Sequence, residues 1–355
     1  MSRLSPSAHQ DRRRQFASDT NAGICPEAWA ALAAANEGHL PAYGDDQLTA
    51  RACDALRRVF ETDCEVFFVA SGTAANALAL ASLCQSYHAI VCHNLAHIET
   101  DECGAPEFFS NGTKLLLADG ELGKLSPAAV AAIVNKRTDV HYPHPRVLSV
   151  TQATEVGTVY RPGELAALGD VCKSLDLKFH MDGARFANAV ATLGVAPKEI
   201  TWQVGVDVLS FGGSKNGLAV GDAVVFFNRT LAEGFAYRCK QAGHLLSKLR
   251  FVAAPWMGLL ESGAWLRNAE HANQMAQLLA AELQGVAGVE VMFPRQANAV
   301  FVRLNPAHRD ALWARGWKFY DFIGAGGARL MCSWDTTEAD VKALAADLRE
   351  VASSG

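Results

Sequence analysis

The sequence lacks the features that mark several large classes of protein. Its 355 residues carry a formal net charge of −5, and the one basic run is Arg12-Arg13-Arg14. Without a larger basic block, neither a nucleic acid nor an anionic membrane fits as a partner. No stretch approaches the roughly 20 apolar residues of a membrane-spanning helix, and no apolar segment of a signal peptide follows the arginines. We therefore expect a protein that binds neither nucleic acid nor membrane.

Paired cysteines are also missing. The nine cysteines are an odd number and form no C-x-x-C pair, which argues against a disulfide framework and against a zinc site. We expect reduced, mostly buried thiols in a cytoplasmic protein, and no bound metal. The positions are Cys25, Cys53, Cys64, Cys84, Cys92, Cys103, Cys172, Cys239 and Cys332.

The glycine motifs of nucleotide-binding proteins are absent as well. No G-x-G-x-x-G follows the first expected strand, and no G-x-x-x-x-G-K-[ST] occurs. This absence argues against an α/β nucleotide-binding or regulatory module, which is the alternative to an enzyme for this chain.

The chain is instead rich in short apolar runs. Half of the residues are hydrophobic and the mean hydropathy is +0.06. Seven runs of strand length, mostly separated by amphipathic stretches of helix length, predict a doubly wound α/β fold with a seven-stranded, mostly parallel sheet. A short Gly-containing loop precedes the last run, so that strand is expected to be antiparallel. The runs cover 66–69, 89–92, 114–117, 147–150, 177–180, 206–210 and 223–227.

The pattern changes to an α+β type from about residue 251. We expect an N-terminal arm over 1–20, a large α/β domain over 21–255 and a smaller α+β domain over 256–355. The elements expected in the last part are a long helix over 259–285, strands at 289–292 and 299–302, a helix at 306–315, a strand at 328–332 and a final helix capped by Thr336 or Thr337.

Two residues carry the strongest chemical signal. Asp182 ends an apolar strand, and Lys215 lies in a loop of small residues after the next strand. This arrangement is typical of an enzyme that uses pyridoxal phosphate (PLP), in which the lysine forms a Schiff base and the aspartate keeps the pyridine nitrogen protonated. The alternatives are a buried salt bridge beside a Gly-rich turn for Asp182 and an exposed loop lysine for Lys215. With the residues described next, we favour PLP.

Ser71-Gly72-Thr73 follows the first strong strand and opens an Ala-rich helix. The free N–H groups and the positive end of a helix dipole suit a phosphate dianion, and Thr73 adds a hydroxyl donor. The alternative is a plain N-cap. Ala74 and Ala75 keep bulk away from the helix start, which favours the phosphate.

Other candidates lie just after strands, where side chains overhang the crevice at the carboxyl edge of a sheet. His97 can stack on the PLP ring or take a proton, and its alternative is a loop histidine bonded to a backbone carbonyl. Gln152 and the pair Thr154-Glu155 can contact the ring oxygen of PLP or the hydroxyl of a substrate. Their alternative is a loop that caps the next helix.

Two arginines suit the recognition of a carboxylate. Arg185 comes three residues after Asp182, so its guanidinium can meet PLP or a substrate carboxylate, or else form a structural bridge to a helix. Arg329 has apolar neighbours, and a buried arginine needs the carboxylate of a substrate or of the protein.

Seven motifs resemble, in their order, those of the threonine aldolase family of fold-type I PLP enzymes. Two further segments, Ile24-Cys25-Pro26-Glu27 and 101–107, make the chain most similar to the bacterial low-specificity L-threonine aldolases and the related phenylserine aldolases. The motifs are Ser18-Asp19-Thr20, Tyr43-Gly44-Asp45-Asp46, Ser71-Gly72-Thr73, Ala96-His97-Ile98, His180-Met181-Asp182-Gly183-Ala184-Arg185, Ser214-Lys215 and Arg329-Leu330.

The resemblance implies PLP as the cofactor and assigns its contacts. Lys215 is the Schiff-base lysine, Asp182 pairs with the pyridine nitrogen and His97 stacks on the ring. Gly72 and Thr73 bind the phosphate. Arg250 is assigned to the same phosphate across a subunit interface.

The resemblance also implies how an amino acid substrate is held. Ser18, Arg185 and Arg329 bind its carboxylate, and Tyr43 enters from a neighbouring subunit. The family is tetrameric and built from close dimers, so a homotetramer is expected.

The activity implied is retro-aldol cleavage of L-threonine, L-allo-threonine and related β-hydroxy-α-amino acids to glycine and an aldehyde. A preference for phenylserine, another PLP lyase and an aminotransferase are the alternatives with the same cofactor. Many family members carry a second active-site histidine in the loop after the fourth strand, but residues 151–155 contain none. The base that takes the β-hydroxyl proton is then His97, Thr154, Glu155 or a bound water.

Overall fold

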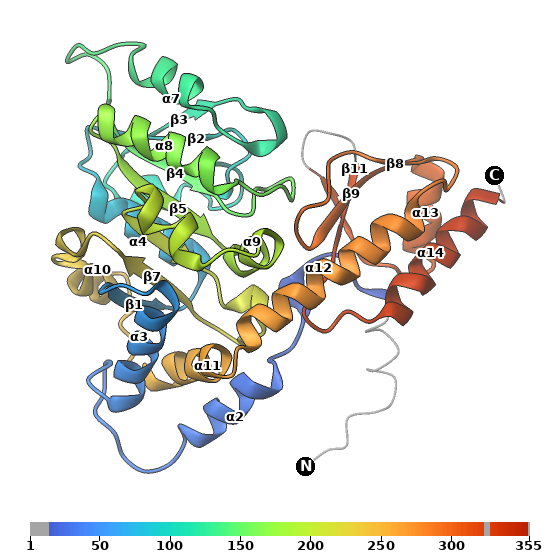
Figure 1. The fold of residues 1–355 in the computed structure, drawn as a ribbon, viewed down its shortest axis with the longest axis horizontal. Helices are drawn as coiled ribbons and strands as arrows, with labels where there is room; N and C mark the ends of the chain where they lie inside the picture. The colour runs from blue at the N-terminus through green and yellow to red at the C-terminus, as the bar shows by residue number, and fades with distance from the viewer. Residues whose placement is uncertain (1–13, 323–326, 354–355) are drawn as a thin grey trace.

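The computed structural model describes residues 14–322 and 327–353, and its larger part is built on a seven-stranded sheet (Figure 1). The strand order is β1-β7-β6-β5-β4-β2-β3. Neighbouring strands are parallel except that β7 runs antiparallel to both β1 and β6. The strands are β1 (Glu65–Val69), β2 (His88–His93), β3 (Lys114–Ala118), β4 (His144–Thr151), β5 (Lys178–Gly183), β6 (Val208–Phe211) and β7 (Asp222–Phe226).

This sheet confirms the α/β fold class and the antiparallel last strand. The parallel strands are joined by helical crossovers, whereas β6 and β7 are joined by residues 212–221, which contain only one short 3-10 turn. A connection without a crossover helix returns the chain as an antiparallel neighbour.

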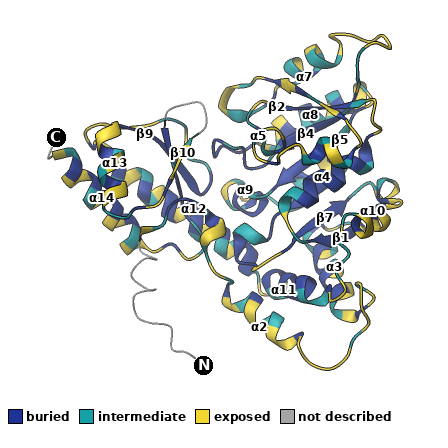
Figure 2. Ribbon diagram, turned by 180° about the vertical axis from the view of Figure 1, so that it is seen from behind, coloured by how far each residue is buried: buried dark blue, intermediate teal, exposed yellow. Residues whose placement is uncertain are grey.

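Helices cover both faces of the large sheet (Figure 2). The helix α4, nine of whose residues are buried, packs with α10 on one face. The other face is covered by α3, α7, α8, α9 and α11. Because both faces are covered, β6 and β7 are buried along their whole length, and their sequences read as continuous apolar runs. The helices are α2 (Pro26–Ala34), α3 (Gln47–Phe60), α4 (Gly72–Leu83), α5 (His97–Thr100), α6 (Ala105–Phe109), α7 (Pro127–Val134), α8 (Pro162–Ser174), α9 (Phe186–Leu193), α10 (Phe235–Gln241) and α11 (Arg250–Glu261).

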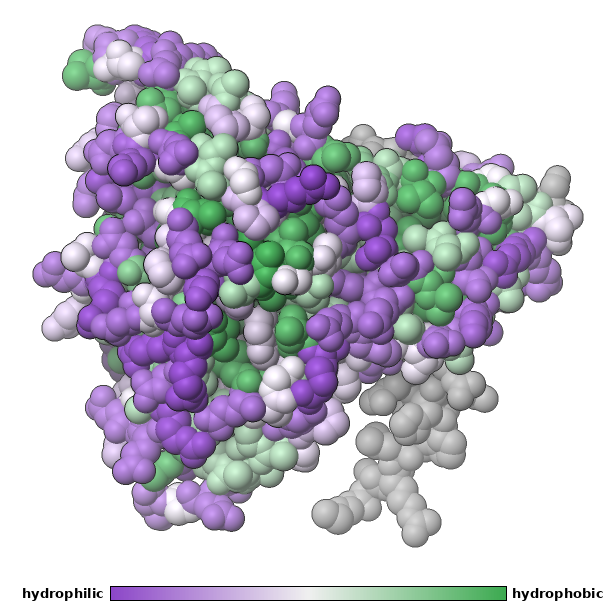
Figure 3. All heavy atoms as spheres, viewed as in Figure 1, coloured by the Kyte–Doolittle hydropathy of each residue, from purple (hydrophilic) through white to green (hydrophobic). Residues whose placement is uncertain are grey.

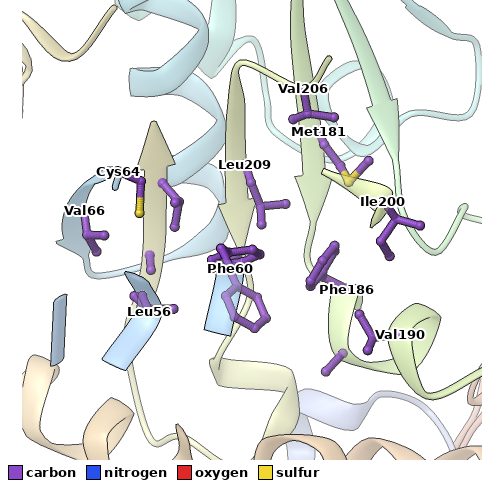
Figure 4. Close-up of a cluster of buried hydrophobic side chains, with 14 of the residues drawn as sticks. Leu56, Phe60, Cys64, Val66, Met181, Phe186, Val190, Ile200, Val206 and Leu209 are labelled. Carbon is purple, nitrogen blue, oxygen red and sulfur yellow. The ribbon is translucent and has the colours of Figure 1, made fainter. Parts of the chain in front are cut away.

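An aromatic cluster in the main core fixes the turn after β5. The Phe60 ring lies 5.9 Å from the rings of both Phe186 and Phe211, and the three side chains are fully buried. Figure 4 shows Phe60 and Phe186 facing one another across the core. Since Phe186 directly follows the segment that carries Asp182 and Arg185, this packing anchors the turn that presents those two residues.

A four-stranded antiparallel sheet in the order β10-β11-β9-β8 forms the smaller part. The segment that precedes the first helices belongs to this part, because the Phe16 N–H donates to the Lys318 carbonyl at 2.7 Å and the Met331 N–H donates to the Phe16 carbonyl at 2.8 Å. The elements are α12 (Ala264–Leu283), β8 (Val289–Val291), β9 (Ala299–Leu304), α13 (Pro306–Ala314), β10 (Tyr320–Phe322), β11 (Gly327–Met331) and α14 (Glu338–Ser353).

One expected helix was wrong in its extent. The stretch 259–285 is not one helix, because α11 ends at Glu261 and α12 begins at Ala264. Gly263 between them has a φ of +71°, a left-handed conformation that glycine adopts without strain. The Ser262 hydroxyl accepts the Ala264 N–H at 3.2 Å and so caps the second helix. The final helix begins after Thr337, whose hydroxyl accepts the Asp340 N–H at 3.2 Å.

The expected boundary between 255 and 256 falls inside α11. Val252, Trp256 and Leu259 on this helix are all buried in the core of the large sheet. We therefore propose to divide the chain after α11 and not within it. Of the expected arm over 1–20, residues 1–13 lie outside the described residues, and Phe16 packs in the core of the small sheet.

Hydrophilic side chains predominate on the face drawn in Figure 3, and smaller apolar areas interrupt them. Within residues 14–322 and 327–353, no helix combines the length and the apolar character that a bilayer crossing requires.

Candidate active site

Two connected cavities lie at the carboxyl edge of the large sheet, facing the small sheet. The outer cavity has a volume of about 530 Å³ and the inner one about 290 Å³. Thr20, His97, Glu155 and Lys215 line both, so the cavities form one continuous site. The inner cavity also takes in Ser71, Gly72, Thr73, Asp182 and Asp222, and the outer one Ser18, Arg185, Tyr320, Phe322 and Arg329.

The loop that carries Lys215 is held by a carboxylate that the sequence analysis did not single out. Asp222, buried at the start of β7, accepts on Oδ1 the N–H of Gly213 at 2.7 Å, the N–H of Ser214 at 3.1 Å and the Ser214 hydroxyl at 3.1 Å. An ionised acceptor shared by three donors holds the short turn η6 (Ser214–Asn216) in place. An acid opening an otherwise apolar strand after the lysine loop was the signal that could have revealed it.

The same loop packs too closely for any side chain at its first position. A Cβ built on Gly212 would lie 2.5 Å from the Ala184 carbonyl oxygen, which is backbone and cannot give way. The contact joins the turn after β6 to the turn after β5. Lys215 and Asp182 are therefore positioned relative to one another by backbone packing as well as by hydrogen bonds.

A chain of buried polar groups connects Asp182 to His97. The Asn76 side-chain amide on α4 donates to Asp182 Oδ2 and to Glu102 Oε1, both at 2.9 Å. Glu102 Oε1 also lies 2.8 Å from His97 Nδ1. Asp182 Oδ1 accepts the Ala184 N–H at 2.9 Å. This network fixes the imidazole at one wall of the inner cavity and the carboxylate at another.

The partners in this network shift one another's proton affinity. The hydrogen bond to Glu102 raises the pKa of His97, although burial of the ring acts against it. Burial raises the pKa of Glu102, and its hydrogen bonds from His97 and Asn76 offset part of that effect. The pair therefore retains a proton to higher pH than either group would alone.

A neutral histidine lies beneath Asp182 in the sheet. His180 is fully buried, with Nδ1 2.9 Å from the Ser149 hydroxyl and Nε2 3.1 Å from the Ser210 hydroxyl. Burial lowers the pKa of His180 to about 4. A neutral ring with both nitrogens paired links β4, β5 and β6 directly below the carboxyl edge and supports the position of Asp182.

The start of α4 lines the inner cavity as the sequence predicted, and Ser71 also serves as the N-cap, accepting the Ala74 N–H at 3.3 Å. A Cβ on Gly72 would lie 3.1 Å from Asp222 Oδ2, so the helix start and the lysine loop are close together. The phosphate and N-cap interpretations of Ser71 are thus compatible.

Arg185 forms a structural bridge at the outer cavity. Its Nε and Nη2 donate to the two oxygens of buried Asp19 at 2.8 and 2.9 Å. Burial would raise the pKa of Asp19, but the charge and hydrogen bonds of Arg185 lower it to about 2. Asn298 donates to the same carboxylate at 3.0 Å. Most of the Arg185 guanidinium is therefore committed to Asp19, which the sequence analysis did not assign to it.

The Arg329 guanidinium has fewer protein partners than that of Arg185. Its Nη2 donates to the Ala17 carbonyl at 3.3 Å, its Nε is buried without a hydrogen-bond partner, and no ion pair joins it to a carboxylate of the described residues. Burial and the nearby charge of Arg185 lower the pKa of Arg329. A half-buried cation with a buried, unpartnered Nε has unused capacity for an anion.

Gln152 lines neither cavity of the single chain, and its expected contact with cofactor or substrate stays a prediction. It is fully buried. Its amide donates to the Tyr160 carbonyl at 2.9 Å and accepts the Tyr160 N–H at 3.0 Å. Both ends of the side chain therefore hold the turn after β4, which is a structural role within the loop.

Comparison with known proteins now decides the family. A sequence profile described as beta-eliminating lyase matches residues 15–306. The chain belongs to the beta-eliminating lyase family. It is 63% identical over 344 residues to the low specificity L-threonine aldolase of a Pseudomonas species, covering 97% of this chain and 99% of the relative. It is 64% identical over 341 residues to the low specificity L-threonine aldolase of Pseudomonas aeruginosa, covering 96% and 99%.

A solved structure supports the same family and shows the same fold. The threonine aldolase of Leishmania major superposes with a TM-score of 0.89 at 26% identity, covering 95% of this chain and 99% of that one. The resemblance to threonine aldolases and the fold-type I architecture are thereby confirmed.

Two residues of this beta-eliminating lyase that the resemblance assigned to the site line neither cavity of the single chain. Tyr43 is about half exposed, with the Lys240 ammonium 4.4 Å from its ring. Arg250 begins α11 and stacks on Phe251 at 4.8 Å, and its buried Nε has no hydrogen-bond partner among the described residues. Both were expected to act at an interface between subunits, and that role stays a prediction.

Proposed function

We propose that the protein is a PLP-dependent lyase that cleaves L-threonine, L-allo-threonine and related β-hydroxy-α-amino acids to glycine and an aldehyde. The observation that carries the proposal is the convergence of Lys215, Asp182 and His97 on one cavity that opens toward Arg329, a guanidinium with no ion pair to a carboxylate of the described residues. The near full-length similarity to low specificity L-threonine aldolases supports it.

The inner cavity suits PLP in its volume and in the polar groups that line it. The Lys215 amine forms no hydrogen bond or ion pair with the described residues, and it faces a cavity of about 290 Å³. We assign the cofactor aldehyde to Lys215, the ring nitrogen to Asp182, the ring face to His97 and the phosphate to Ser71, Gly72 and Thr73. When bound, PLP supplies an electron sink for the substrate Cα.

The protein's own residues orient the substrate. We infer that Arg329 binds the amino acid carboxylate, with the Ser18 hydroxyl and the remaining Arg185 nitrogen beside it, since all three line the outer cavity. Fixing the carboxylate there, while Lys215 is on the inner side, sets the direction of the Cα–Cβ bond. The small sheet supplies Arg329, and its strand β10 closes the outer wall.

A preference for phenylserine-type substrates has one observation in its favour. Leu95, Tyr320 and Phe322 line the outer cavity, where the substituent on Cβ must lie. These side chains suit an aryl group better than a methyl group because they offer more apolar contact area. The ratio of kcat/KM for phenylserine to that for threonine measures the preference, and a ratio well below one would contradict it.

The reaction is tested with L-threonine and purified protein supplied with PLP. The aldolase yields acetaldehyde and glycine, whereas a dehydrating lyase yields ammonia and a 2-oxo acid, and an aminotransferase needs an acceptor. Lys215→Ala is expected to lose the activity and the visible absorbance band of the bound cofactor. Wild-type turnover by that variant would refute the assignment.

We also propose a homotetramer in the cytoplasm. The nine cysteines are all unpaired, which suits a reducing compartment. Trp29, Tyr43 and Tyr237 are large exposed side chains suited to subunit contacts. Light scattering of the purified protein measures the oligomeric state directly.

A further inference from the structure

We propose that Glu155 is the catalytic base that takes the proton from the β-hydroxyl of the substrate. This inference rests on the proposed cleavage reaction and names the one group for which the sequence left several candidates. It rests on the position of the Glu155 carboxylate between the two cavities and on the hydrogen bonds that the neighbouring polar side chains already make.

Glu155 is placed where the two cavities meet. Among the described carboxylates that line these cavities, it is the one common to both: Asp101 and Asp321 line only the outer cavity, and Asp182 and Asp222 only the inner one. A substrate whose Cα is near Lys215 and whose carboxylate is at Arg329 has its Cβ substituents between the two cavities. The hydroxyl on Cβ is therefore within the region that Glu155 borders.

The Glu155 carboxylate is available to act. It takes part in no hydrogen bond or ion pair with the described residues, and its side chain is half-buried. Its negative charge contributes to raising the pKa of His97 and of Arg185 and opposes the lowering of the Arg329 pKa. The carboxylate is thus within electrostatic reach of the groups that surround the substrate.

The backbone beneath Glu155 is held firmly. The Thr154 N–H donates to the Thr158 carbonyl at 2.9 Å, and the Gly157 N–H donates to the Thr154 carbonyl at 2.9 Å. The Thr158 hydroxyl donates to the Leu122 carbonyl at 2.6 Å. These bonds close the turn after β4 with Glu155 at its tip, and a base on a fixed turn is already positioned for proton transfer.

The other side-chain candidates are committed elsewhere. The Thr154 hydroxyl is buried, lies 2.7 Å from the Thr158 hydroxyl and lines neither cavity. His97 is bonded through Nδ1 to Glu102, and its ring is assigned above to the face of the cofactor, so this side chain is committed to other roles. Asp101 accepts the Thr100 hydroxyl at 3.1 Å and is exposed at the mouth of the site.

The step balances in atoms and electrons. Glu155 takes the hydroxyl proton, the O–H electron pair becomes the second bond of the aldehyde C=O, and the Cα–Cβ bond breaks with its electron pair left at Cα. A proton then replaces the lost group at Cα to give glycine, and Glu155 releases the proton that it took. No oxidant or reductant is required.

The test separates the hydroxyl proton from the Cα proton. Glycine has no β-hydroxyl, so exchange of its Cα hydrogen with D2O, followed by NMR, needs the cofactor site but not this base. For Glu155→Gln we expect kcat for L-threonine cleavage to fall about 100-fold or more, while glycine exchange and the PLP dissociation constant measured by absorbance stay within about threefold of the wild type. Glu121→Gln, an exposed carboxylate outside both cavities, is the matched control and keeps cleavage unchanged.

Three outcomes would overturn the assignment. Cleavage by Glu155→Gln within tenfold of the wild type means that another group takes the proton. An equal loss of cleavage and of glycine exchange means that Glu155 supports the site as a whole. If the wild type itself exchanges glycine but does not cleave threonine, the proposed function fails and the base assignment fails with it.

Discussion

Asp19 links three separate parts of the protein, and its removal is the most informative perturbation of stability. The N-terminal segment carries Asp19, the turn after β5 carries Arg185 and the small sheet's connection carries Asn298, and all three side chains meet. Asp19 is 1% exposed, so water does not replace a lost partner. For Asp19→Asn we expect a loss of about 3–5 kcal/mol in the free energy of unfolding, because Arg185 is left buried and uncompensated.

The pH dependence gives an independent estimate of the same interaction. The pKa of Asp19 is lowered to about 2 in the folded protein from a value of 3.8. A lowered carboxyl pKa stabilises the folded state above the unfolded pKa, and that contribution is lost as pH falls from about 4 through about 2. The shift corresponds to about 2 kcal/mol at neutral pH. Asp19→Asn should lack this acid-dependent component.

Urea unfolding followed by circular dichroism at matched pH values measures both effects. Glu290→Gln removes an exposed partner of Arg303 and serves as the control, with no measurable change expected. A cost below about 1 kcal/mol for Asp19→Asn at neutral pH, or the same acid dependence in variant and wild type, would refute the reasoning.

Three further predictions follow from the site. Arg329→Lys should raise KM for L-threonine at least tenfold in steady-state kinetics with a smaller effect on kcat, because a point charge replaces the guanidinium fork; an unchanged KM would count against the carboxylate assignment. Asp222→Ala should weaken PLP uptake at least tenfold in an absorbance titration, and Asp222→Asn should weaken it less because the amide oxygen can still accept from the lysine loop. Equal uptake by the wild type and both variants would show that Asp222 does not hold the loop that carries Lys215. In Glu102→Gln the pKa of His97 should fall toward its ordinary value, whereas in the wild type the imidazolium persists to higher pH. An NMR titration of the ring protons measures this difference. Identical titrations of variant and wild type would show that Glu102 does not raise the pKa of His97.

The predicted site residues that the structure brings together are those with a strong local signal. Asp182 ends a buried strand, and Lys215 stands in a loop of small residues, so strand pattern and chemistry pointed to the same edge of the sheet. The Ser71-Gly72-Thr73 helix start was recognisable for the same reason. These features depend on residues close together in the chain.

The residues that the sequence did not reveal act through distant partners. Asn76 reads as one polar residue in an Ala-rich helix, yet its partners are Glu102 and Asp182. Arg185 was expected to meet an anionic ligand or to form a structural bridge, but the sequence could not show that its bridge would be to a carboxylate 166 positions away. Periodicity and composition say nothing about which buried polar groups meet, because that depends on tertiary packing.

The path of the N-terminal segment has a consequence for how the protein folds. Phe16 pairs with Lys318 and Met331, so one of the first described residues is held by residues that are synthesised much later. Arg329, which neighbours that pairing, donates to the Ala17 carbonyl 312 positions earlier. Closing so long a loop is costly in chain entropy and is not compensated until both ends are present. The large sheet, whose last strand ends at Phe226, can therefore be complete before the segment that carries Arg329 is synthesised, so the outer wall of the binding site forms after the inner one.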